Sequence, residues 1–180
     1  YDRPAFLGVH RIGLTEALTA GLRLEADLAL VSAGPTVTVL LPYGQMDFSA
    51  GASRAGSRSG VAGYIGYNYR QADFGFGASI RGMSGHYSNL SQKASDDRAH
   101  LETNLSTGFQ VTARTSLDLR YTFSNAHAQG RMQQMSFSSS TRLTDWLSLL
   151  LTGSHSRTKG SGVTEVLANL GIHLGSANVN

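Results

Sequence analysis

The stretch Leu117-Asp118-Leu119-Arg120-Tyr121-Thr122-Phe123-Ser124 alternates strictly between apolar and polar side chains. Successive side chains of an extended strand point to opposite faces of a sheet. One face of this segment therefore carries Leu, Leu, Tyr and Phe, and the other carries Asp, Arg, Thr and Ser. The stretch predicts a β-strand with one apolar and one polar face.

The same alternation continues on both sides of this segment and then along most of the chain. It predicts about eleven antiparallel strands of roughly ten residues, which is the length that a tilted strand needs to cross a bilayer. The predicted strands are 5–14, 18–26, 29–41, 45–54, 60–70, 74–84, 98–111, 115–126, 132–143, 146–156 and 164–174.

Two of these strands have irregular patterns. In 5–14, Leu7 and Val9 compete with Phe6, Ile12 and Leu14 for the apolar face. The strand 29–41 is interrupted by Gly34-Pro35. Proline lacks a donor for the strand ladder and glycine often marks an irregular position, so a bulge or a strained position is expected there.

The predicted connections alternate between short and long. The short ones are 15–16, 42–44, 71–73, 113–114 and 144–145, and the longer ones are 55–59, 85–97, 128–131 and 157–163. Outer-membrane barrels have short periplasmic turns and longer external loops. Aromatic residues gather at the short-turn end, which predicts a membrane-interface position for Tyr43, Tyr67, Tyr69, Phe74, Phe109 and Trp146.

The charges on the polar face separate a membrane barrel from a soluble β-barrel or sandwich. The predicted lumen-lining residues are Arg23, Glu25, Asp47, Arg81, Glu102, Asp118, Arg120 and Arg142. Unpaired charges in a dry interior are very costly, so this face must be wet. The apolar face is rich in small residues, and lipid requires no interlocking core. The sequence predicts an all-β, antiparallel up-and-down transmembrane β-barrel segment over 1–180, in contact with outer-membrane lipid, with no separate soluble domain.

An odd strand number conflicts with closure. Single-chain bacterial barrels close with an even number of strands, and an open edge cannot face lipid. Either one strand is missed, or this chain is part of a larger barrel that the rest of the barrel or a second copy closes. The start at Tyr1, typical of a mature or trimmed chain, and the polar residues 176–180 favour the second interpretation.

Composition excludes several classes of function. The chain has no cysteine, so neither disulfides nor thiolate metal sites are expected. The net charge of +3 is spread along the chain rather than clustered, so a nucleic-acid partner is not expected. No apolar run approaches the roughly 20 residues of a membrane helix.

No catalytic, metal or cofactor site is predicted. The six histidines are dispersed over different strands and loops. His100, Glu102 and Asp118 are candidates for proton transfer, although a mixed-charge lumen produces the same pattern. The pair Asp96-Asp97 has ligands suited to Ca²⁺, although adjacent acids are usual in a solvated loop.

Three stretches resemble the outer-membrane ushers of chaperone–usher pili. They are 11–21, 67–74 with 84–90, and 147–175, although His173 stands where that family often has proline. The resemblance implies a barrel segment after the usher plug, a translocation pore for pilus subunits, and pilus subunits and a periplasmic chaperone as partners. It transfers no chaperone-binding residue onto this chain.

A passive diffusion channel of the porin type, or another secretion barrel, is the alternative. A porin would need a loop that folds inward to narrow the pore. Only the segment 85–97 is long enough to provide it.

Overall fold

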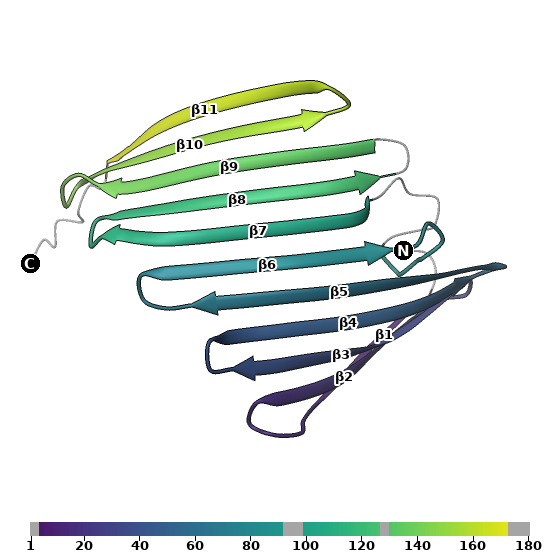
Figure 1. The fold of residues 1–180 in the computed structure, drawn as a ribbon. Coiled ribbons are helices and arrows are strands. Elements are labelled where there is room, and N and C mark those ends of the chain that lie inside the picture. The colour runs from purple at the N-terminus through teal and green to yellow at the C-terminus, as the bar shows by residue number, and fades with distance from the viewer. Residues whose placement is uncertain (1–3, 92–98, 127–129, 173–180) are drawn as a thin grey trace, which may run out of the picture.

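The computed structural model describes residues 4–91, 99–126 and 130–172, and these residues form one antiparallel sheet. Its strands follow one another in chain order, and each pairs with the next (Figure 1). They are β1 (Phe6–Gly13), β2 (Leu18–Ala26), β3 (Leu30–Leu41), β4 (Gly44–Ala55), β5 (Arg58–Arg70), β6 (Phe74–Met83), β7 (Ala99–Thr112), β8 (Thr115–Ala126), β9 (Gly130–Arg142), β10 (Leu147–Thr158) and β11 (Ser161–Ile172).

The register joins the alternating strands into two continuous faces. Arg81 lies opposite Tyr64 on one side and Glu102 on the other, so these residues share a face. Leu119 and Phe137 lie opposite each other on the other face. We call the face that carries Arg81 the polar face and the face that carries Leu119 the apolar face.

The apolar face is not covered by protein. Among the described residues, Leu30 is the only hydrophobic residue that is buried. Large side chains of the apolar face stay exposed, for example Ile65 at 52% and Leu170 at 68%. A soluble sandwich would pack such side chains into a core, so the soluble alternative does not fit. The predicted all-β, up-and-down membrane wall is confirmed.

The described residues contain no helix that is both long and apolar enough to cross a membrane.

The sheet has two open edges in the described part of the chain. There β1 pairs only with β2, and β11 pairs only with β10. The pairing therefore gives a curved wall whose ends do not meet (Figure 1).

Two connections predicted to be long are tight turns. β4 and β5 are joined through residues 56–57, with Gly56 at φ 59°, and β10 and β11 through residues 159–160, with Gly160 at φ 88°. Such left-handed geometry matches the twist of hairpin strands and costs glycine little. The prediction of longer loops was wrong at these two turns. The alternation is therefore weaker than expected, and the connection from β6 to β7 is the long one.

Of the two alternatives predicted at Gly34-Pro35, a bulge or a strained position, the bulge was wrong. Ala33 pairs with Ala52 and Thr36 pairs with Ser49, so the register passes this point without a shift. The strands instead approach each other closely, because a Cβ atom on Gly34 would lie 1.8 Å from the backbone oxygen of Ala50.

In β1 the competition for the apolar face is resolved by register. Leu7 lies opposite Glu25 and Val9 lies opposite Arg23, so both are on the polar face. Phe6 and Ile12 are on the apolar face.

Candidate functional site

The polar face collects all of the charged residues that the sequence assigned to a lumen. They come from six of the strands, and the register places them on the same face: Arg23 and Glu25 on β2, Asp47 on β4, Arg81 on β6, Glu102 on β7, Asp118 and Arg120 on β8, and Arg142 on β9.

The beginning of the β6 to β7 connection folds back over this face. We call its described part, Ser84–Ser91, the inward loop. It leaves β6 by pairing with β5: the Ser84 amide donates to the Val61 carbonyl at 2.8 Å, and the Val61 amide donates to Ser84 Oγ at 2.9 Å. The chain then turns, with the Tyr87 amide donating to the Ser84 carbonyl at 3.1 Å.

Three further contacts attach the inward loop to polar side chains of the wall. The Leu90 amide donates to Glu25 Oε2 at 2.8 Å. The Ser88 amide donates to Ser53 Oγ at 2.8 Å. The Tyr87 hydroxyl lies 3.3 Å from Ser32 Oγ. The inward loop therefore touches three separate strands, β2, β3 and β4, on their polar face.

The contact between loop and wall is tightly packed. Its polar members are the most buried polar groups among the described residues: Glu25 and Ser88 at 2% exposure, and Ser32 and Ser53 at 5%. Gly60 on β5 makes the close approach possible, because a Cβ atom there would lie 2.1 Å from the Tyr87 amide nitrogen. A long polar loop and a glycine at this position are the only sequence signals, and neither predicts the contact.

Two ion pairs on the polar face have the same orientation. Arg23 pairs with Glu25, and their side chains are 54% and 3% exposed. Arg81 pairs with Glu102 at 2.6 Å, with side chains 44% and 26% exposed. Asn104 also donates to Glu102, at 2.9 Å. In each pair the guanidinium is the more exposed partner, so the positive ends face the open side.

A cavity of about 300 Å³ lies between the inward loop and the wall. Arg23, Arg81 and Tyr64 line it from the wall, and Tyr87 and Asn89 line it from the loop. These side chains present guanidinium, hydroxyl and amide groups. Glu25 also lines the cavity, so its charged groups are two guanidinium groups and one carboxylate.

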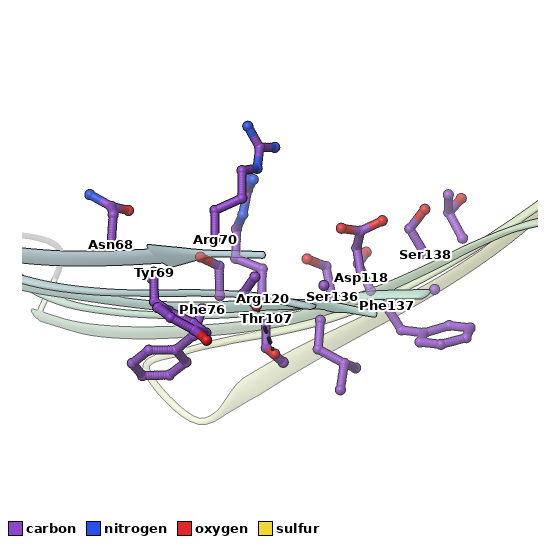
Figure 2. A pocket seen from close by; sticks show the side chains of 18 of the residues that line it. Asn68, Tyr69, Arg70, Phe76, Thr107, Asp118, Arg120, Ser136, Phe137 and Ser138 are labelled. Atoms are coloured by element: carbon purple, nitrogen blue, oxygen red, sulfur yellow. Dashed lines mark hydrogen bonds between the residues drawn. The ribbon is translucent and has the colours of Figure 1, made fainter. Parts of the chain in front are cut away.

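A wider hollow of about 860 Å³ extends over the polar face toward β11. Its lining includes Gly75, Gly77 and Gly108, and the side chains of Ser106 and Asp118 lie close over Gly77 and Gly108. Figure 2 shows that polar and aromatic residues of this region leave the sheet on opposite sides. The polar ones are Asn68, Arg70, Asp118, Arg120, Ser136 and Ser138, and the aromatic ones are Tyr69, Phe76 and Phe137. A hydrated passage needs such a polar lining.

The predicted interface aromatics form a patch on the apolar face near the β5 to β6 turn. The ring centroids of Tyr69 and Phe74 lie 5.9 Å apart, and those of Phe74 and Phe109 lie 5.1 Å apart. The Tyr67 hydroxyl donates to the Tyr43 carbonyl. Trp146 lies apart from this patch, in the β9 to β10 turn, and is 54% exposed. A role at the membrane interface stays a prediction for these residues.

Asp118, one of the three candidates for proton transfer, lies away from Glu102. Nδ1 of His100 lies 3.2 Å from the Met83 carbonyl oxygen. Asp118 lies opposite Gly108, six residues along β7 from Glu102, which is roughly 20 Å in a strand. Within the described ranges, no three His, Asp or Glu side chains are placed to hold a metal. The pair Asp96-Asp97 lies outside the described residues.

No family model matches the sequence. No curated protein matches it either.

Solved structures of outer-membrane channels share the fold. One is the outer membrane channel DcaP of Acinetobacter baumannii, with 10% identity and a TM-score of 0.65 over 90% of this chain and 60% of that one. Another is the anion-selective porin from Comamonas acidovorans, with 12% identity and a TM-score of 0.59 over 90% of this chain and 57% of that one. This chain thus spans about three fifths of their length.

These structures correct the usher resemblance. The proteins that share the fold are porins and channels rather than ushers. The three usher-like stretches are loose motifs, and any barrel with alternating strands and tight turns produces similar ones. The likeness confirms the outer-membrane location predicted from the alternating strands, and the chain has the fold of the wall of an outer-membrane channel.

Proposed function

We propose that this chain forms the wall and the constriction of a porin-type channel through which small hydrophilic solutes diffuse. The observation that carries the proposal is the inward loop. A porin needs a segment that narrows a wide barrel from inside, and Ser84–Ser91 lies on the polar face rather than outside the barrel.

The lining supports passive diffusion of hydrated solutes. The wide hollow is lined by serine, threonine and asparagine together with charges of both signs. A lining of this kind keeps water in the passage. A pore for folded protein subunits would need a clear lumen, whereas the inward loop occupies part of this one.

The experiment is solute uptake by vesicles that contain the full-length protein. We expect sugars and amino acids of low mass to enter quickly and larger oligosaccharides to enter slowly or not at all, because the constriction limits the size of a solute. Vesicles without protein give the background. Correct insertion is verified independently by resistance of the folded protein to detergent. Inserted protein that leaves the vesicles impermeable to the smallest sugar contradicts the proposal.

A further inference from the structure

Beside the cavity between the inward loop and the wall, the positively charged side chains are more exposed than the negatively charged ones. In both ion pairs beside the cavity, the arginine side chain is more exposed than the glutamate side chain. The Glu25 side chain is 3% exposed while that of Arg23 is 54% exposed. The Glu102 side chain is 26% exposed while that of Arg81 is 44% exposed.

Each carboxylate also accepts a hydrogen bond from a second donor. Glu25 accepts from the Leu90 amide in addition to Arg23. Glu102 accepts from Asn104 in addition to Arg81. Each of the four carboxylate oxygens therefore already has one partner. Both arginines line the cavity, and each guanidinium has five N–H groups in all, more than its carboxylate partner uses.

One acid, Glu25, also lines the cavity, but its side chain is 3% exposed and both of its carboxylate oxygens already have partners, Arg23 and the Leu90 amide. Asp47 lies on the same face but does not line the cavity, and it accepts hydrogen bonds from Thr38 at 2.7 Å and from Gln45 at 2.9 Å. The remaining polar groups at the cavity include the Tyr64 and Tyr87 hydroxyls and the Asn89 amide, all of which can donate. A solute in this cavity therefore meets two guanidinium groups, one almost fully buried carboxylate, and neutral groups that can donate or accept.

We infer that the cavity under the inward loop is an anion-binding station in the permeation path, with Arg23 and Arg81 as its cationic groups. Its ligands are small anions and solutes that carry a carboxylate or phosphate. Arginine suits this purpose because its planar fork donates two parallel hydrogen bonds to such groups. Rings and clusters of basic side chains select anions in pores. The inference rests on the proposed function, because the station acts only if solutes pass the inward loop.

Arg81 is the residue to test, because Arg23 also neutralises the buried Glu25 and its loss would disturb the loop. The measurement is the reversal potential of the full-length protein in a planar bilayer between two KCl concentrations. We expect the unmodified channel to prefer Cl⁻ over K⁺. Arg81→Gln should lose most of that preference and Arg81→Lys should keep most of it, because lysine retains the charge.

Arg142→Gln provides the matched control. It removes the same charge from the same face at the other end of the barrel, where Arg142 pairs with Ser148 in the register and is not part of the cavity lining. We expect it to change the reversal potential much less than Arg81→Gln does.

The outcomes separate this inference from the proposed function. A channel that conducts but prefers K⁺ or neither ion overturns the anion station and leaves the diffusion channel intact. Equal effects of Arg81→Gln and Arg142→Gln also overturn it, because they would assign selectivity to the whole pore. Absence of any conductance from correctly inserted protein overturns the proposed function itself.

Discussion

The carboxylate of Glu25 on β2 accepts a hydrogen bond from the backbone amide of Leu90, which lies 65 residues later in the chain. The Glu25 side chain is almost fully buried and also pairs with Arg23. One side chain thus fixes the far part of the inward loop to the wall. Together with the contacts of Ser88 and Tyr87, this hydrogen bond holds the loop on the polar face.

We predict that Glu25→Ala releases this part of the loop. A hydrogen bond to a charged group contributes roughly 1.5–3 kcal/mol, which corresponds to about a 10- to 150-fold shift toward the detached loop. Single-channel recordings of the full-length protein should show a larger and noisier conductance. Glu25→Gln should be intermediate, because it retains an acceptor for the Leu90 amide but loses the charge.

Asp47→Ala is the control for Glu25→Ala. Asp47 is an acid on the same face, but its hydrogen bonds go to Thr38 and Gln45 and not to the loop. We expect a conductance close to that of the unmodified channel. Equal conductance in Glu25→Ala and the unmodified channel would show that this contact does not hold the constriction.

The packing of Tyr87 on Gly60 leads to a second prediction. A Cβ atom at Gly60 would lie 2.1 Å from the Tyr87 amide nitrogen and 2.3 Å from its Cα, so Gly60→Ala must push the loop away. The same change at Gly63, on the same strand but on the apolar face, meets its nearest atom at 4.0 Å. Gly60→Ala should therefore loosen the loop, and Gly63→Ala should not.

Cysteine labelling measures this loosening directly. Ser88 is 2% exposed, and the 180 residues contain no cysteine, so Ser88→Cys introduces one buried thiol into this part of the chain. A water-soluble maleimide should react slowly with it in the unmodified background and in Gly63→Ala. The reaction should be much faster in Gly60→Ala. Fast labelling in all three backgrounds would mean that the loop does not rest on the wall.

Leu105 and Ser106 test the assignment of the two faces. They are neighbours on β7, but Leu105 lies opposite Tyr121 on the apolar face and Ser106 lies opposite Arg120 on the polar face. A lysine at the bilayer midplane costs a barrel about 2–4 kcal/mol. Leu105→Lys should therefore lower the stability of the full-length protein in lipid vesicles by about this amount in urea titrations. Ser106→Lys should change it little, and a larger loss at Ser106 would reverse the two faces.

The strands were predictable because period-two alternation holds at most positions of the wall. Side chains of such a wall face either lipid or water. The alternation within a stretch such as 117–124 is therefore enough to predict a strand with one apolar and one polar face. The turns at 56–57 and 159–160 were less predictable. Each of these hairpins depends on left-handed φ values, at Gly56 in one turn and at both Lys159 and Gly160 in the other, and the flanking polar residues are the same in a longer loop.

The sequence predicted that a long segment could fold inward, but it did not predict where that segment contacts the wall. Tyr87, Ser88 and Asn89 are equally suited to an external loop, because they are polar. Their position is decided by contacts with β2, β3 and β4, which are distant in the chain. The shared face of the charged residues was predictable for the opposite reason, since strand alternation alone assigns them to it. Their pairing was not, because it depends on register between strands.

The open edges of the sheet lead to the last prediction. In the described residues β1 and β11 each have one unpaired edge, and an unsatisfied backbone group in lipid costs several kcal/mol. With β1 to β11 all antiparallel in order, β1 and β11 run in the same direction, so pairing them directly would be parallel. Single-chain bacterial barrels instead use an even number of antiparallel strands. We therefore propose that further strands, from the rest of the barrel or from a second copy, pair with both edges.

Hydrogen exchange of the full-length protein in lipid tests this closure. Amides of β1 and β11 should exchange as slowly as those of β5, which is paired on both sides. A single chain that closes its own barrel should keep this protection at high dilution in detergent, whereas closure by a second copy should lose it as the copies separate. Fast exchange along β1 and β11 in lipid, at the rate of exposed turns, would contradict closure by any partner, because unpaired edge amides would then be open to water.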